Sequence, residues 1–160
     1  MKAILGLGTN MGDREGNLTY ALQSLGRLIG TVLIRHSDFY ITEPVEVTTQ
    51  QDDYLNCVAE IETELSPEVL LGACLGIESA IGRVRVYDKA PRVIDIDLLI
   101  YEGETRCSEE LTLPHNGIPT RAFVLFPLIE LYPEGTALGY EFGGFTASVA
   151  GQRISRINRS

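Results

Sequence analysis

Two aspartates at alternate positions, Asp95 and Asp97, are the residues of this sequence whose type and spacing most directly suggest chemistry. They lie in an apolar run, 91–101, which is rich in β-branched residues and is followed by Glu102 and Gly103, so the run is predicted to be a strand. Because side chains alternate across a strand, both carboxylates are expected to emerge on the same face.

The face that carries the two carboxylates does not have the composition of a solvated face. Its other positions are Val93, Leu99 and Tyr101, and the opposite face is predicted to hold four aliphatic residues: Ile94, Ile96, Leu98 and Ile100. Two like charges on a mostly apolar face repel each other and lose hydration. A hard divalent cation held by oxygen ligands would compensate them best. The alternative is an edge strand with two exposed acids.

A basic cluster directly precedes the acid pair, with Arg83, Arg85, Lys89 and Arg92 lying within ten residues. Eleven of the 13 Lys and Arg residues are Arg, whose planar guanidinium binds phosphate in a bidentate way. The formal net charge of −9 argues against nucleic-acid or membrane-surface binding. One basic cluster in an acidic chain instead indicates a small anionic ligand, and the alternative is a solvated charged loop.

The run 54–63 is predicted to be a strand that places Tyr54, Asn56, Val58 and Glu60 on one face. The ring of Tyr54 and the amide of Asn56 would then lie side by side. This combination suits a flat heteroaromatic ligand with hydrogen-bonding edges. Taken alone, the pattern also fits a strand that simply starts with a tyrosine at its rim.

Two further patterns carry weaker signals. His115 lies in a Pro-containing loop six residues before Arg121, a pair that can bind phosphate, although a lone histidine is more often structural. Gly6 and Gly8 invite comparison with a dinucleotide-binding loop, but there is no third glycine in register and no parallel βαβ pattern downstream.

The first hundred residues are predicted to contain six elements. Strands are expected at 2–7, 31–42, 54–63 and 91–101, with one helix after the first strand and another after the third. This β-α-β-β-α-β order is the split βαβ, or ferredoxin-like, arrangement, in which two helices pack on one face of an antiparallel sheet.

The tail must cover the other face of the sheet, giving an α+β fold with helices on both faces. It is predicted to form a short strand at 111–113, an apolar helix or turn at 121–131 and a short helix at 145–150.

Both predicted helices carry end signals. Asn10 or Asp13 can cap the first helix, and Gly30 can end it. Its apolar stripe would be Leu18, Ala21, Leu22, Leu25, Leu28 and Ile29. Ser66 can cap the second helix, and Gly82 is its natural end.

Length and composition predict a single domain over residues 1–160, with a proper core. The N-terminus lacks the pattern of a signal peptide, and no apolar stretch approaches membrane-spanning length. Cys57, Cys74 and Cys107 are predicted to be reduced thiols, two of them in the core, in a cytoplasmic protein. We expect the chain to act alone, as a monomer.

Taken together, these segments resemble the 6-hydroxymethyl-7,8-dihydropterin pyrophosphokinase family of folate biosynthesis. The resemblance runs in the right order from about Ile4 to Pro133, and Pro-Arg-x-x-Asp-x-Asp-Leu at 91–98 is its most specific part. The other matching segments are 5–13 with Asn17 and Leu18, 53–56, 82–85, 113–115 and 121–128.

The resemblance implies transfer of the β,γ-pyrophosphoryl group of ATP to the hydroxymethyl oxygen of the pterin, giving AMP and the pterin pyrophosphate. ATP and hydroxymethyldihydropterin would be the partners, and two Mg²⁺ ions would be held by Asp95 and Asp97. Arg83 and Arg92 match positions that contact the transferring phosphates, so catalysis is assigned to these arginines and to the two aspartates.

The resemblance also implies further contacts. His115 and Arg121 match phosphate contacts from the other side of the nucleotide, and Arg85 matches a position on the catalytic loop. The pterin pocket would be formed by Tyr54, Asn56 and Phe123, flanked by Thr42 and Val45. Two rival interpretations stay open: a non-catalytic ferredoxin-like ligand-binding module, and a degenerate family member that binds only the pterin.

Overall fold

A computed structural model describes residues 1–42, 53–82 and 93–157 of the chain. Its main elements, in chain order, are β1 (Lys2–Thr9), α1 (Arg14–Gly26), β2 (Thr31–His36), β3 (Phe39–Thr42), β4 (Tyr54–Thr63), α2 (Pro67–Ile81), β5 (Asp95–Tyr101), α3 (Ala122–Leu131) and β10 (Ile154–Ile157). Shorter elements are β6 (Arg106–Cys107), β7 (Thr112–Leu113), η1 (Ile118–Thr120), β8 (Thr136–Ala137), β9 (Tyr140–Glu141) and η2 (Gly143–Val149).

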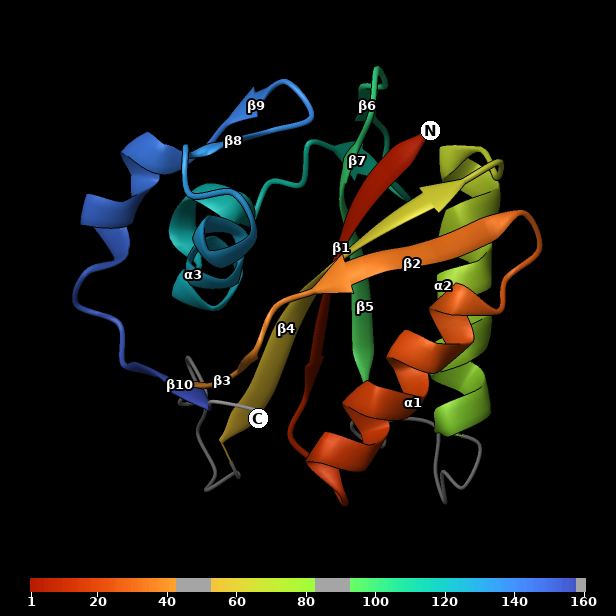
Figure 1. The fold of residues 1–160 in the computed structure, drawn as a ribbon, viewed down its shortest axis with the longest axis horizontal. Coiled ribbons are helices and arrows are strands. Elements are labelled where there is room, and N and C mark those ends of the chain that lie inside the picture. Colours follow the sequence, from red (N-terminus) through yellow and green to blue (C-terminus); the bar gives the residue numbers. More distant parts are fainter. Residues whose placement is uncertain (43–52, 83–92, 158–160) are drawn as a thin grey trace.

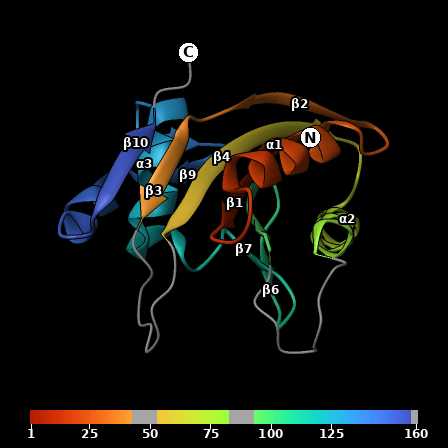
Figure 2. The same cartoon turned by 90° about the horizontal axis from the view of Figure 1, so that it is seen from below.

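The main sheet has the strand order β10-β3-β4-β1-β5, and β2 also pairs with β4. Every strand pairing in it is antiparallel. The predicted α+β class with an antiparallel sheet is therefore confirmed. Figures 1 and 2 show α1 and α2 on one side of this sheet and α3 on the other.

Each face of the sheet has its own hydrophobic core. Leu5 and Leu7 of β1 pack with Leu18 and Leu25 of α1 and with Leu70 of α2 in the first core. The second core joins the opposite face to α3, and its fully buried members include Ile4, Val58, Leu125, Leu128 and Phe142. Consecutive residues of β1 thus enter different cores, as strand alternation requires.

The helix ends follow local capping chemistry. The Asp13 carboxylate accepts the Gly16 N–H of α1, and the Ser66 hydroxyl accepts the Val69 N–H of α2. Gly82 ends α2 as predicted.

The prediction for the end of α1 is wrong by three residues: the last helical residue is Gly26, and the C-cap residue is Arg27 instead of Gly30. Gly30 instead has a φ of +60° and turns the chain into β2. Ile29, which was placed in the apolar stripe, lies beyond the helix and is 83% exposed.

The predicted single strand 31–42 is two strands, β2 and β3, separated at Ser37. The Val58 N–H of β4 donates to the Ser37 hydroxyl oxygen (3.0 Å) instead of a backbone carbonyl. The Ser37 N–H still donates to the Val58 carbonyl (2.8 Å). A side chain thus replaces one backbone acceptor at the break, which lets β3 continue along β4 to form the wall of a cavity.

Strand β5 contains a bulge that changes its faces part-way along. Ile4 of β1 is opposite Ile100, and Leu5 is opposite Leu98, so Leu99 is an extra residue. The predicted alternation holds from Ile94 to Leu99 and then fails. Ile100 packs in the core on the α3 side and Tyr101 in the core on the α1–α2 side, the reverse of the prediction.

The tail covers the second face, with elements close to the predicted ranges: β7 at 112–113, α3 at 122–131 and the 3₁₀ helix η2 at 143–149. The last strand, β10, was not predicted, and it pairs with the edge of β3. Arg156 of β10 donates to the Asp38 carboxylate (2.7 Å), and Glu130 of α3 accepts from the Asp38 N–H and from the Tyr40 hydroxyl. These contacts tie the end of the tail to both β3 and α3.

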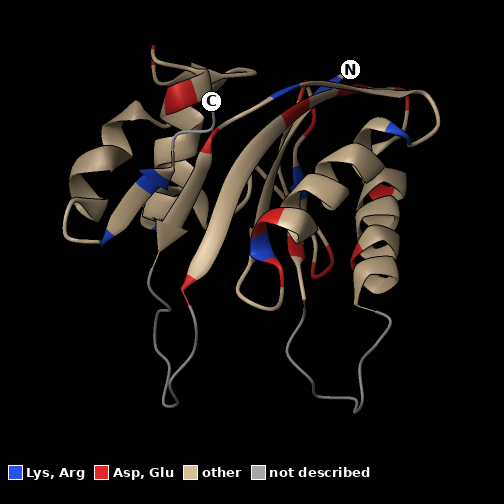
Figure 3. Ribbon diagram, turned by 60° about the horizontal axis from the view of Figure 1, so that its bottom comes forward, with Lys and Arg blue, Asp and Glu red and all other residues tan. Residues whose placement is uncertain are grey.

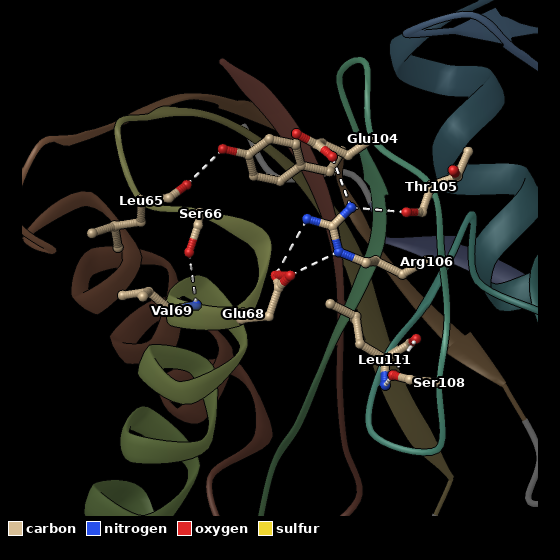
Figure 4. Close-up of polar contacts among 10 residues, drawn as sticks. Leu65, Ser66, Glu68, Val69, Glu104, Thr105, Arg106, Ser108 and Leu111 are labelled. Carbon is tan, nitrogen blue, oxygen red and sulfur yellow. Dashed lines mark hydrogen bonds and ion pairs between the residues drawn. The ribbon is translucent and has the colours of Figure 1, made fainter.

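The start of α2 is tied to the β6–β7 hairpin by one guanidinium, as Figure 4 shows. Arg106 donates to the Glu68 carboxylate through Nε (2.7 Å) and to the Glu104 carboxylate through Nη1 (2.7 Å). Because these groups are partly or largely solvated, their net contribution to stability is small.

Charged residues of the described ribbon lie on both sides of the sheet and do not gather on one face (Figure 3). Among the helices that the structure describes, each is too short or too polar to traverse a lipid bilayer.

The three thiols differ sharply in exposure, which a labelling experiment can test. Cys57 and Cys74 are buried, and Cys107 is exposed. Burial, with smaller effects of Glu78 and Asp97, raises the pKa of the Cys74 thiol to about 12. Since the thiolate is the reactive species, iodoacetamide at pH 8 is expected to modify Cys107 and leave Cys74 intact in the folded protein. Peptide mass spectrometry measures this, with urea-unfolded protein as the fully labelled control; equal labelling of both thiols before unfolding would contradict the fold.

Candidate functional site

One cavity of about 550 Å³ lies between the α3-side face of the sheet and the start of α3. It is lined by residues of β1, β3, β4, β5, α3 and the tail: Gly6, Leu7, Gly8, Thr42, Tyr54, Asn56, Cys57, Asp95, Asp97, Thr120, Arg121, Phe123, Val124 and Gln152. Seven of the predicted site residues are therefore brought together here, although they come from four separate elements: β3, β4, β5 and the start of α3.

The floor of the cavity is the middle of β1. Gly8 is opposite Asp95 on one side and Asn56 on the other, and Gly6 is opposite Asp97. With adjacent strands about 4.8 Å apart, the acid strand and the amide strand are separated by roughly 10 Å of side-chain-free backbone. Gly6 and Gly8 thus lie within a strand and not in a loop, and their lack of a Cβ leaves room for the Leu99 and Asn56 side chains, which approach them closely.

The amide of Asn56 has a defined orientation. It is buried, and its Nδ2 donates to the Thr42 hydroxyl (2.9 Å). Its Oδ1 lies only 2.6 Å from the position that a Cβ on Gly8 would occupy. The oxygen is therefore directed over the glycine floor, where it can accept a hydrogen bond from a ligand.

The two aspartates are half-buried and influence different neighbours. Burial, and to a smaller extent the charge of Asp95, raises the pKa of the Tyr54 hydroxyl, so this group is a protonated donor at neutral pH. On the other edge of β5, the Glu78 carboxylate of α2 accepts the Ile96 N–H (2.7 Å), which fixes the backbone between the two aspartates.

The wall opposite the sheet is the start of α3. Arg121 is the N-cap residue, and its guanidinium carbon lies 5.7 Å from the centre of the Phe123 ring. A Cβ on Gly117 would lie 2.8 Å from that same carbon, so the glycine makes room for the guanidinium. A cation and an aromatic face are thus presented side by side at one edge of the cavity.

His115 lies next to the cavity but is not among the residues that line it. Its Nδ1 accepts the Gly117 N–H (2.9 Å), which leaves Nε2 as the protonated nitrogen of the neutral ring. Burial lowers the pKa of His115; Asp97 opposes this shift and Arg121 adds to it. The imidazole is therefore neutral at pH 7 and can act as a hydrogen-bond donor near both charged groups.

Four predicted site residues, Val45, Arg83, Arg85 and Arg92, lie outside the described residues. Seven cavity residues were not among the predicted site residues: Gly6, Leu7, Gly8, Cys57, Thr120, Val124 and Gln152. Val124 is one residue from Phe123 in a helix that was predicted, so it could have been found. Gln152 carries no sequence signal, because it lies in the tail far from every motif.

The profile of the 7,8-dihydro-6-hydroxymethylpterin-pyrophosphokinase (HPPK) family matches residues 4–133. The chain belongs to this family. This match confirms two expectations from the sequence: the family, and a pyrophosphokinase activity in folate biosynthesis. The match ends before η2 and β10, so the part of the tail that contributes Gln152 lies outside it.

Similar curated proteins carry corresponding names. The chain is 47% identical over 133 residues to the 2-amino-4-hydroxy-6-hydroxymethyldihydropteridine pyrophosphokinase of Methylorubrum extorquens, covering 83% of this chain and 84% of that protein. It is 40% identical over 129 residues to the protein of the same name from Haemophilus influenzae, covering 81% and 80%.

Solved HPPK structures share the fold. The HPPK-DHPS chain of Plasmodium falciparum aligns with a TM-score of 0.62 at 14% identity, over 89% of this chain and 42% of that one. A second HPPK-DHPS chain, crystallised with substrates, gives a TM-score of 0.66 at 13% identity, over 93% and 42%. This chain spans about two fifths of the length of these longer chains.

Replacing Gly8 with alanine tests the glycine floor. The new Cβ would lie 2.6 Å from Asn56 Oδ1, so the amide must move and weaken its bond to Thr42. We expect Gly8→Ala to lower the free energy of unfolding by about 1–3 kcal/mol, as overpacking does. Urea denaturation measures this effect.

Gly6→Ala is the matched control for this variant. Its Cβ would meet only the flexible Leu99 side chain, at 3.3 Å, so the loss of stability should be smaller. Equal losses in the two variants would show that the Gly8–Asn56 contact is not the deciding one.

Proposed function

We propose that this cavity binds hydroxymethyldihydropterin between β4 and α3, binds ATP over the acid pair, and transfers the pyrophosphoryl group of ATP to the pterin hydroxymethyl oxygen, releasing AMP. One observation carries the proposal: Asp95 and Asp97 share a single cavity with Tyr54, Asn56 and Phe123, across a floor without side chains. The two substrates would thus meet above β1.

The pterin end of the cavity offers complementary groups. Phe123 and Tyr54 are half-buried rings from opposite walls, suited to hold a flat heterocycle. Asn56 Oδ1 would accept from the ring edge, because its Nδ2 is held by Thr42. The Tyr54 hydroxyl, kept protonated by burial and by Asp95, can donate.

The acid pair fits magnesium. Its donors are hard carboxylate oxygens on one face of β5, and Mg²⁺ is typically held by one or two carboxylates plus substrate phosphates and water. Among the described residues, no three or more His, Cys, Asp or Glu side chains gather into a site that would hold an ion alone. We therefore propose that Asp95 and Asp97 hold two Mg²⁺ ions together with ATP. When bound, these ions would supply charge neutralisation of the triphosphate.

The basic residues would position the phosphates. Arg121 presents its guanidinium at the edge of the cavity, and the neutral His115 can donate through Nε2. Arg83, Arg85 and Arg92 are proposed as further phosphate contacts on the basis of their sequence positions alone. Phosphoryl-type transfer depends mostly on such positioning and electrostatic stabilisation.

We also propose that the six-element core is ferredoxin-like. The support is the chain order β1-α1-β2/β3-β4-α2-β5, with β1 between β4 and β5 and all pairings antiparallel.

The activity itself is tested by mixing the protein with ATP, Mg²⁺ and hydroxymethyldihydropterin and separating the nucleotides. We expect AMP rather than ADP, with no AMP when Mg²⁺ is chelated. Pterin binding without AMP would favour a degenerate member that binds only the pterin, and neither binding nor AMP would favour a non-catalytic module.

The metal role is tested by Asp97→Asn, which removes a charge and keeps the shape. Turnover should fall by at least 10²-fold while the melting temperature stays close to that of the wild type, since the acid pair would act through the ion. Glu62→Gln, which changes an exposed carboxylate on β4, is the control and should keep full activity. Normal magnesium-dependent turnover in Asp97→Asn would rule out the metal assignment.

Substitutions at the two ends of the cavity should change the KM values of different substrates. Phe123→Ala should raise the KM for the pterin about tenfold or more and change the KM for ATP little, because the ring is assigned to the heterocycle. Arg121→Ala should show the opposite pattern. Steady-state kinetics with each substrate varied in turn would reveal the split, and parallel changes in both KM values would contradict the assignment.

A further inference from the structure

The tail residue Gln152 makes two hydrogen bonds to the segment that carries Arg121. Its Oε1 accepts the Ala122 N–H (3.0 Å), and its Nε2 donates to the Thr120 carbonyl (2.8 Å). These two partners lie immediately before and after Arg121. One carboxamide therefore holds the backbone on both sides of the arginine.

The Ala122 N–H needs such a partner. It is the first N–H of α3, and the N-cap residue Arg121 provides no side-chain cap. The first N–H groups of a helix have no acceptor within the helix, so they depend on capping groups, water or ligands. Gln152, 30 residues away in the sequence, thus provides the hydrogen-bond acceptor at the start of α3. At the starts of α1 and α2, neighbouring residues provide such an acceptor.

The tail around Gln152 is fixed at both ends. On one side, η2 packs against η1. On the other side, Ile154 is opposite Thr42 of β3, and Arg156 is paired with Asp38. The tail therefore connects the Arg121 wall of the cavity to the Thr42 wall.

We propose that Gln152 is a positioning residue for Arg121: it fixes the 120–122 backbone so that the guanidinium stays at the cavity edge when the anionic substrate binds. Gln152 borders the cavity, but both its polar atoms are engaged by the backbone, so it acts through Arg121 rather than on the substrate. It lies outside the residues 4–133 that match the family profile, and the proposal rests on the proposed function of Arg121.

The first test is independent of activity. In Gln152→Ala, the Ala122 amide loses its acceptor, so its hydrogen exchange measured by NMR should become about tenfold faster. Ser148→Ala is the matched control, because it removes a tail hydroxyl beside Pro119 and leaves both bonds that flank Arg121 intact. Unchanged exchange at Ala122 in Gln152→Ala would overturn the proposal.

The second test is a double-mutant cycle on kcat/KM for ATP. Gln152→Ala should lower this constant about tenfold in the wild-type background and have almost no effect when Arg121 is already alanine. Ser148→Ala should leave it unchanged in both backgrounds. A general loss of stability would act equally in both backgrounds, so an additive cycle would overturn the positioning role.

The wild-type measurement separates this proposal from the proposed function. If the wild type forms AMP and the cycle is additive, only the role of Gln152 is wrong. If the wild type neither binds ATP with Mg²⁺ nor forms AMP, the proposed function and the role of Gln152 are both overturned.

Discussion

The pairing of β1 with both β4 and β5 is the constraint on which the site depends. One face of β1 is fully used by the core under α1 and α2, through Ala3, Leu5 and Leu7. The other face gives Ile4 to the second core and then carries two glycines. Without side chains at Gly6 and Gly8, the central strand leaves a floor between the acids of β5 and the amide of β4. A central strand of ordinary composition would fill that space.

The two aspartates beside this floor influence different neighbouring groups. Asp95 and Asp97 lie half-buried on one strand face, and their fields reach Tyr54 and His115 respectively. Burial keeps the tyrosine protonated and the histidine neutral, so both can donate hydrogen bonds close to the carboxylates. The arrangement therefore brings hydrogen-bond donors and a pair of carboxylates together. This suits a ligand that carries phosphate oxygens and binds together with cations.

Packing on the second face links the site to the tail. The second core holds α3 against the sheet, and Glu130, Asp38 and Arg156 join α3, β3 and β10. The start of α3 is then fixed by Gln152, which lies beyond the residues 4–133 that match the family profile. One wall of the cavity is thus held by a part of the chain that the sequence motifs do not include.

The sequence by itself determined the elements with strong local signals. The strand 54–63 and the helix ending at Gly82 were predicted with their correct bounds, because alternation, capping and proline act over a few residues. It also identified the acid pair and the ring-and-amide pair as chemical groups, since residue type and strand period are enough for that.

Only the tertiary structure decided how these groups meet. The bulge at Leu99 and the break at Ser37 depend on pairing with other strands, so local periodicity could not reveal them. The role of Gly6 and Gly8 as the floor of the cavity depends on which strands lie on either side of β1. Gln152 belongs to the cavity through bonds to residues 30 and 32 positions away, and long-range contacts of this kind leave no mark in local sequence.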